Sequence, residues 1–227
     1  MTRLLSLALC AGFCAAALGG CTHTVPLKSE TASFNWSSQQ KRLLVIEPEV
    51  QLGELTVGGL VEPRADWSGR AAHAIESSLS SALAQRGIEV RTLDTLSDPH
   101  DIQLAKLHAI VGAEILIHNL GLSKLPTKKS ALDWTLGPGA NDLRTRYGAD
   151  YGMFVFVHDT YSSDSRKALM LLGMANGGSQ TAFASLVDLR TGNIVWFNQL
   201  YTPAGGDLRD GSGAADFTAN LLKDAPL

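Results

Sequence analysis

From residue 42 onward, short apolar runs alternate with stretches of helical periodicity. Arg42–Glu47 is an apolar run closed by Pro48, which predicts a buried strand. Tyr151–His158 is apolar almost throughout and is typical of a central strand that is buried on both faces. Gln180–Leu189 and Asn193–Tyr201 alternate instead, and a glycine in the intervening turn favours a β-hairpin.

Weaker patterns predict two further strand regions. Val50–Val61 alternates loosely around Gly58-Gly59, which indicates one or two short strands at a sheet edge. Ile88–Leu93 alternates between apolar and polar residues and predicts another strand.

The clearest helix is predicted between Asp66, a good N-cap residue, and Arg86, which precedes Gly87. Its apolar positions recur at four-residue steps, as one buried helical face requires: Ala71, Ile75, Leu79 and Leu83. Shorter helices are predicted at Ala140–Tyr147 and Ser212–Asp224.

Residues 98–120 allow two interpretations. Ile102, Ala105, Ala109 and Ala113 have helical spacing, which favours a helix over most of the segment. The alternative ends the helix at Gly112 and makes Glu114–Asn119 a strand. The following segment, Leu122–Gly139, is predicted to be mostly loop, and the pattern assigns it no role.

This order of elements predicts one α/β domain over residues 42–227, with a mixed β-sheet flanked by helices in two or three layers. Residues 21–41 are rich in Ser, Thr, Gln and Lys and are predicted to form a flexible tether before the domain.

The amino terminus has the form of an export signal. Arg3 precedes the apolar stretch Leu4–Leu18, which is shorter than the roughly 20 residues that a membrane-spanning helix needs. The stretch ends in Leu18-Gly19-Gly20-Cys21, which resembles the lipobox of bacterial lipoproteins.

The lipobox resemblance implies that residues 1–20 are a signal peptide, cleaved between Gly20 and Cys21. It also implies that the Cys21 thiol and the new amino group carry acyl chains, which would hold the protein to a lipid bilayer. In such lipoproteins Asp after the cysteine favours retention at the inner membrane. Thr22 therefore implies the outer membrane, facing the periplasm.

Composition narrows the chemistry. The net charge of −3 excludes the strongly basic character of a nucleic-acid-binding protein. Of the three cysteines, Cys10 and Cys14 lie in the predicted signal and Cys21 is the predicted lipid carrier. The mature chain is therefore predicted to form no disulfide and no thiolate metal site. No cofactor is expected.

The sequence contains almost no recognisable catalytic motif. The sequence contains no Gly-x-Ser-x-Gly motif, and its six histidines form no close metal-ligand pair. The remaining enzymatic alternative is that His158 and Asp159 act as a base and its orienting group. We expect a non-enzymatic protein.

The most suggestive binding segment is the Met- and Leu-rich stretch 166–174, since methionine suits adaptable surfaces. One interpretation is a surface that contacts a partner or a membrane, and the other is a helix packed on the sheet. The candidate contact residues are Lys167, Leu169, Met170, Leu171 and Met174, together with Trp134 of the long loop.

Three segments resemble a group of bacterial envelope proteins that includes the curli-secretion lipoprotein CsgG, the peptidoglycan-synthase activator LpoB and the amino-terminal domain of TolB. The segments are Arg42–Pro48, Tyr147–Val157 and Ser185–Trp196, the last with an Asp-x-x-Thr-Gly turn. The resemblance implies a fold of this type and a binding or assembly factor that acts on an envelope protein, such as a cell-wall synthase or a secretion component. The alternative is a homo-oligomeric secretion subunit of the CsgG type.

Overall fold

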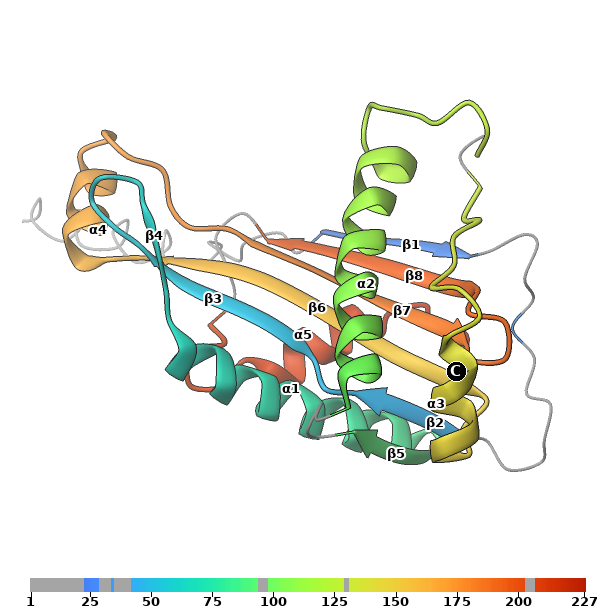
Figure 1. Cartoon of the computed structure of the whole chain (residues 1–227). Coiled ribbons are helices and arrows are strands. Elements are labelled where there is room, and N and C mark those ends of the chain that lie inside the picture. The colour runs from blue at the N-terminus through green and yellow to red at the C-terminus, as the bar shows by residue number, and fades with distance from the viewer. Residues whose placement is uncertain (1–22, 29–33, 35–41, 94–97, 129–130, 203–206) are drawn as a thin grey trace, which may run out of the picture.

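The structure is a computed structural model that describes residues 23–28, 34, 42–93, 98–128, 131–202 and 207–227 (Figure 1). These residues form the predicted α/β fold, with a mixed sheet that is flanked by helices on both faces. The strands are β1 His23–Lys28, β2 Arg42–Ile46, β3 Glu49–Leu55, β4 Val61–Pro63, β5 Glu89–Leu93, β6 Tyr151–Ser162, β7 Gln180–Asp188 and β8 Ile194–Thr202. The helices are α1 Ala65–Gln85, α2 Pro99–Ile115, the π-helix η1 Leu116–Leu120, α3 Ala140–Tyr147, α4 Asp164–Leu171 and α5 Ala214–Leu221.

Strand β6 is a central strand of the sheet, whose main strand order is β1-β8-β7-β6-β2-β5. It pairs with β7 along one side in antiparallel fashion. Along its other side β2 and then β3 pair with it in parallel, one after the other. Strand β6 is therefore longer than the predicted Tyr151–His158, because pairing with β3 extends it to Ser162.

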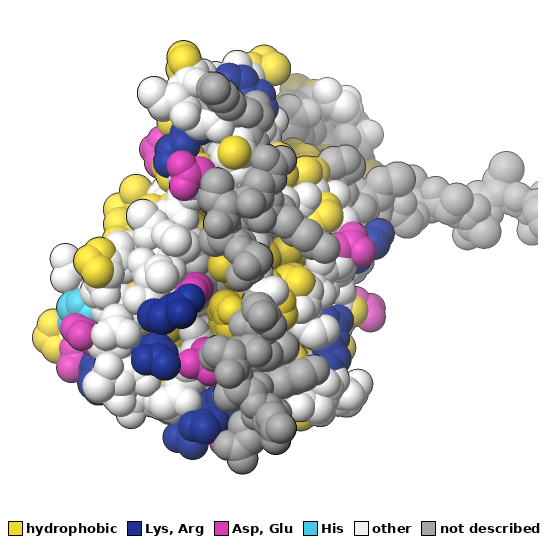
Figure 2. Space-filling view, turned by 90° about the vertical axis from the view of Figure 1, so that its right-hand side faces the viewer, with side chains coloured by type: hydrophobic (Ala, Val, Ile, Leu, Met, Phe, Trp, Pro, Cys, Tyr) yellow, Lys and Arg dark blue, Asp and Glu magenta, His cyan; other side chains and the backbone are white. Residues whose placement is uncertain are grey.

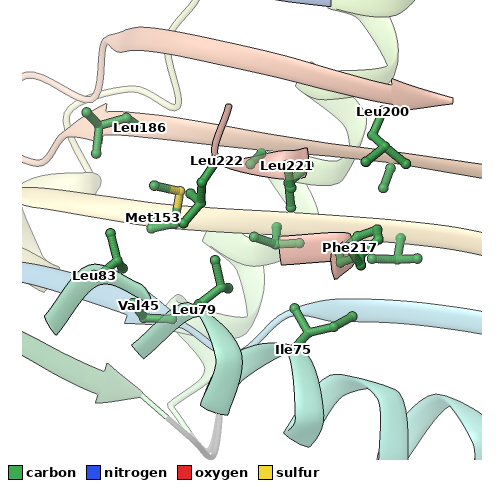
Figure 3. Packing of buried hydrophobic residues seen from close by; sticks show 14 of the residues in the cluster. Val45, Ile75, Leu79, Leu83, Met153, Leu186, Leu200, Phe217, Leu221 and Leu222 are labelled. Carbon is green, nitrogen blue, oxygen red and sulfur yellow. The ribbon is translucent and has the colours of Figure 1, made fainter. Parts of the chain in front are cut away.

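One face of the sheet is covered by α1 and α5 (Figure 1). The four-residue spacing in α1 places Ile75, Leu79 and Leu83 toward the sheet, where they are fully buried (Figure 3). Figure 3 shows them close to Met153 of β6 and Phe217 of α5. The predicted amphipathic face of this helix is therefore confirmed.

The other face carries α2 and α3. Helix α2 crosses the strands steeply (Figure 1), and the helical interpretation of residues 98–120 is correct. Glu114–Asn119 is helical across the junction of α2 and η1, and it is not a strand. The Asp98 carboxylate caps α2 by accepting a hydrogen bond from the His100 amide, at 2.8 Å.

Part of the predicted tether is a strand. Residues His23–Lys28 form β1, which pairs with β8 at the edge of the sheet. Its Pro26 lacks an amide proton, which an edge strand tolerates, and among the described strands β8 alone pairs with β1. The folded domain therefore begins before residue 42. The predicted cleavage site at Gly20 and Cys21, and the rest of the signal, lie outside the described residues.

Candidate functional site

Among the described residues, the largest group of exposed apolar side chains lies at the end of the sheet where β3 and β6 run past the neighbouring strands (Figure 1). The β3–β4 turn and α4 lie side by side there. We call this surface the apolar tip and define it by its strongly exposed side chains: Val57 (52%), Leu60 (73%), Leu171 (89%), Leu172 (70%) and Met174 (71%).

Arg166 holds the two parts of the apolar tip together. Its Nη1 donates to the Thr56 carbonyl at 3.2 Å, and its Nε donates to the Asn176 carbonyl at 2.8 Å. The Ser163 hydroxyl accepts from the Arg166 amide and caps the start of α4. These hydrogen bonds hold the backbone of the β3–β4 turn, α4 and Asn176 together beneath the exposed apolar side chains.

The carboxyl end of α4 is closed by a Schellman motif, in which a glycine adopts a positive φ. Gly173 has φ 69°, and its amide donates to the Met170 carbonyl at 3.0 Å. The Met174 amide donates to the Leu169 carbonyl at 2.9 Å. The helix therefore ends at three strongly exposed apolar side chains, Leu171, Leu172 and Met174.

The structure settles how α4 packs. No α4 residue is buried, so the interpretation of this segment as a helix packed on the sheet is wrong. The reason is topological, since α4 begins only after the pairing of β6 with β3 has ended at Ser162. Of the candidate contact residues here, Lys167, Met170, Leu171 and Met174 are exposed and Leu169 is half-buried.

Val57 and Leu60 were not among the sequence candidates. The signal that could have found them is the segment Val57-Gly58-Gly59-Leu60, in which apolar side chains flank a glycine turn. Turns of this kind usually carry polar residues, so an apolar turn indicates a contact surface.

Trp134 does not join this surface. Its indole Nε1 donates to the Asn119 Oδ1 at 2.7 Å, its ring stacks on His118, and the Lys128 ammonium lies 4.9 Å from the ring centroid. Trp134 packs against the core on the α2 face. In this loop Leu132 and Leu136 are also buried, and Thr135 pairs with Asn193, so the segment covers the sheet.

A pocket of about 460 Å³ lies beneath α4. It is lined by Thr160, Tyr161, Ser162, Lys167, Met170, Gly177, Gly178 and Arg209. The Arg209 guanidinium lies over the Tyr161 ring at 4.7 Å from its centroid, and it also pairs with Asp207 at 2.8 Å. The pocket is therefore a mixed apolar and polar hollow adjoining the apolar tip.

Asp159 is fully buried next to this pocket, in the strand position before Thr160. Its Oδ2 accepts a hydrogen bond from the Gln180 side chain at 2.8 Å. Burial raises the pKa of this carboxyl from 3.8 to about 6, because a buried carboxylate loses its hydration.

The raised pKa of Asp159 predicts a pH-dependent stability. Because the folded state holds this proton more tightly than the unfolded state, the group's contribution is greatest below pH 3.8 and is lost as the pH rises through about 6. Asp159→Asn should therefore raise the unfolding free energy at pH 7 relative to pH 4, by up to about 3 kcal/mol compared with the wild type. Urea unfolding at both pH values measures this difference.

Asp164→Asn is the matched control, since this carboxylate is exposed on α4 and its pKa is lowered by a hydrogen bond from Lys167. If the two variants shifted the pH profile alike, the assignment to the buried Asp159 would be wrong.

His158 and Asp159 do not form a pair. Neighbouring residues of a strand point to opposite faces of the sheet. Accordingly, Asp159 is buried on the α1 side, whereas His158 is exposed on the other face. The base and orienter geometry of the enzymatic alternative is therefore absent.

Among the described residues, no group of three or more His, Cys, Asp or Glu side chains is arranged to hold a metal ion. Within the same part of the chain, every helix is too short or too polar to cross a bilayer.

The chain is thus an α/β domain with an ordered apolar tip at one end of its sheet. No protein-family model matches it, and a comparison with curated proteins finds no match. Among solved structures it is similar to a PelC dodecamer from Paraburkholderia phytofirmans, at 14% identity and a TM-score of 0.43, over 89% of this chain and 95% of that one. A variant PelC dodecamer from the same organism gives 14% identity and a TM-score of 0.41 over the same shares.

Proposed function

We propose that this chain is a bacterial lipoprotein, anchored to the outer membrane by acyl chains on Cys21, that acts by binding in the periplasm. Its α/β domain would serve as a non-enzymatic assembly factor of the cell envelope. The partner would be an envelope protein, as the resemblance to the CsgG, LpoB and TolB group implies.

The observation that carries the proposal is the short distance along the chain between the lipobox and the fold. Strand β1 begins at His23, two residues after Cys21, and it is hydrogen-bonded to β8. An acyl group on Cys21 would therefore hold the domain directly at the bilayer. Such placement suits a protein whose task is to bring a binding surface to a fixed depth in the periplasm.

The anchor is tested by the mass of the native product. We expect the full chain, expressed in a two-membrane bacterium, to partition into detergent with the mass of residues 21–227 plus acyl groups. Cys21→Ser should abolish cleavage and acylation, because serine lacks the nucleophilic sulfur. Cys14→Ser is the matched control and should behave as the wild type. An unmodified thiol at Cys21 of the mature product would overturn the anchor.

The binding role is tested separately by crosslinking in cells. We expect the anchored wild type to crosslink to an envelope protein and Cys21→Ser to lose that product. Products that contain only this chain would instead favour the homo-oligomeric alternative. Recovery of the uncrosslinked chain alone, at normal expression, would contradict both.

A further inference from the structure

The apolar tip and the start of β1 lie at the same end of the sheet. The strand register aligns His23 of β1 with Tyr201 of β8, Tyr201 with Thr181 of β7, and Thr181 with His158 of β6. Each of these pairings is antiparallel, so β1 starts at the end toward which β6 runs. Strand β6 continues past this row to Ser162 and leads into α4.

The separation between the anchor and the base of the apolar tip is small along the strands. From His158 to Ser162, β6 rises about 13 Å, at roughly 3.3 Å per residue. Cys21 precedes His23 by two residues, which span at most about 7 Å. Cys21 and the base of the apolar tip are therefore close in the strand direction, and the exposed side chains of the tip lie beyond that base.

The charge at the apolar tip also fits a bilayer. The β3–β4 turn, residues 56–60, contains no charged residue, and α4 carries Arg166 and Lys167 against the single acidic Asp164. The turn and α4 together thus carry one net positive charge, whereas Glu54 and Glu62 lie on the strands at the base of the turn, where Glu54 pairs with Arg64. Apolar side chains beside basic ones are the composition of surfaces that enter the interface of an anionic bilayer.

The opposite end of the molecule differs in character. The described side chains visible there include basic and acidic groups close together (Figure 2). Arg144 of α3 pairs with Asp150 at 3.3 Å, and Arg190 of the β7–β8 hairpin pairs with Asp188 at 3.3 Å. These paired charges are typical of a surface that faces water.

We propose that the apolar tip enters the interface of the same bilayer that holds the acyl chains of Cys21. This inference rests on the proposed lipid anchor and adds a second point of attachment to it. A single lipid anchor leaves a domain free to rotate, whereas two separated contacts fix its orientation. The strands then run toward the membrane, and α3 and the β7–β8 hairpin face away from it.

The test is a depth measurement on the full, processed chain. In the acylated protein Cys21 carries no free thiol, so Leu171→Cys introduces a unique site for an environment-sensitive fluorophore. The labelled protein is reconstituted into vesicles of phosphatidylcholine with a minority of phosphatidylglycerol. We expect brominated lipids to quench the label at position 171 several-fold more than a label at Leu122→Cys. Leu122 is the matched control, because it is also leucine and fully exposed but lies in the loop after η1.

The possible failures are distinguishable. Reaction of the wild-type protein with the thiol reagent would show a free Cys21 and would overturn the lipid anchor. An unlabelled wild type with equal quenching at positions 171 and 122 would overturn only the tip contact. A blue shift of the position-171 label that depends on protein concentration, without quenching by brominated lipid, would assign the apolar tip to a second copy of this chain and would also overturn the bilayer contact.

Discussion

Gly112→Ala is expected to destabilise the fold strongly, although alanine normally stabilises a helix. Gly112 is buried in α2, where a β-carbon would lie 2.0 Å from the Phe183 ring. The ring has no room to move, because it stacks on Phe156 and Phe197 and contacts His108. Overpacking of this kind costs about 1–3 kcal/mol or more and outweighs the gain of roughly 1 kcal/mol from helix propensity. Urea unfolding of the variant should therefore show a lower midpoint.

Gly69→Ala in α1 is the matched control. A β-carbon at this position meets nothing within 4 Å, so the variant should gain up to about 1 kcal/mol. Phe183→Leu, added to Gly112→Ala, should recover part of the loss, because it removes the ring edge. An unchanged or higher midpoint for Gly112→Ala would contradict the close packing of α2 on β7.

His108 is expected to make the fold sensitive to acid. Its ring is buried between Phe154 and Phe183, and its Nε2 lies 2.9 Å from the Ser185 hydroxyl. Burial lowers the pKa of this imidazole from 6.5 to about 3, because the charged form would lose its hydration. Below pH 6.5 the unfolded chain therefore binds a proton at His108 that the folded chain does not bind, and the contribution of His108 to stability falls as the pH drops toward 3. The loss is on the order of 4 kcal/mol between pH 7 and pH 3.

Between about pH 4 and pH 6, rising pH increases the stabilising contribution of His108 and decreases that of Asp159. The unfolding free energy of the wild type should therefore change little with pH over this range. Asp159→Asn should expose the His108 slope of roughly 1.4 kcal/mol per pH unit. His108→Gln keeps a neutral hydrogen-bonding group near Ser185. In this variant the unfolding free energy should fall as the pH rises from 4 to 6, because only the Asp159 contribution remains. Parallel unfolding curves across pH 4–6 for the two variants would refute both assignments.

The sequence predicted the structure best where a local pattern is compatible with only one kind of element. The spacing of Ile75, Leu79 and Leu83 requires a single buried helical face, and α1 has that face. The Asp188–Gly192 turn requires a residue that tolerates positive φ, and Gly192 adopts φ 79° in the observed hairpin. The predicted helix Ala140–Tyr147 has the same bounds as α3.

The candidate site was predicted only in part. The Met- and Leu-rich composition of residues 166–174 indicated a contact surface, but it equally fitted a helix packed on the sheet. The local sequence cannot distinguish these two interpretations, because both an exposed contact surface and a buried helix face consist of apolar side chains. The end of the β6–β3 pairing at Ser162 decides between them, and that is a property of the assembled sheet.

By itself the sequence determined most of the elements, the α/β class and the lipobox that predicts an anchor at Cys21, because periodicity and short motifs are read within a few residues. Only the tertiary structure decided that His23–Lys28 is an edge strand, that Asp159 is buried while His158 is exposed, and that the turn holding Val57 and Leu60 is hydrogen-bonded to Arg166 of α4. Each of these depends on contacts between segments far apart in the chain. Such contacts are set by which strands pair and in which register, and no local pattern encodes them.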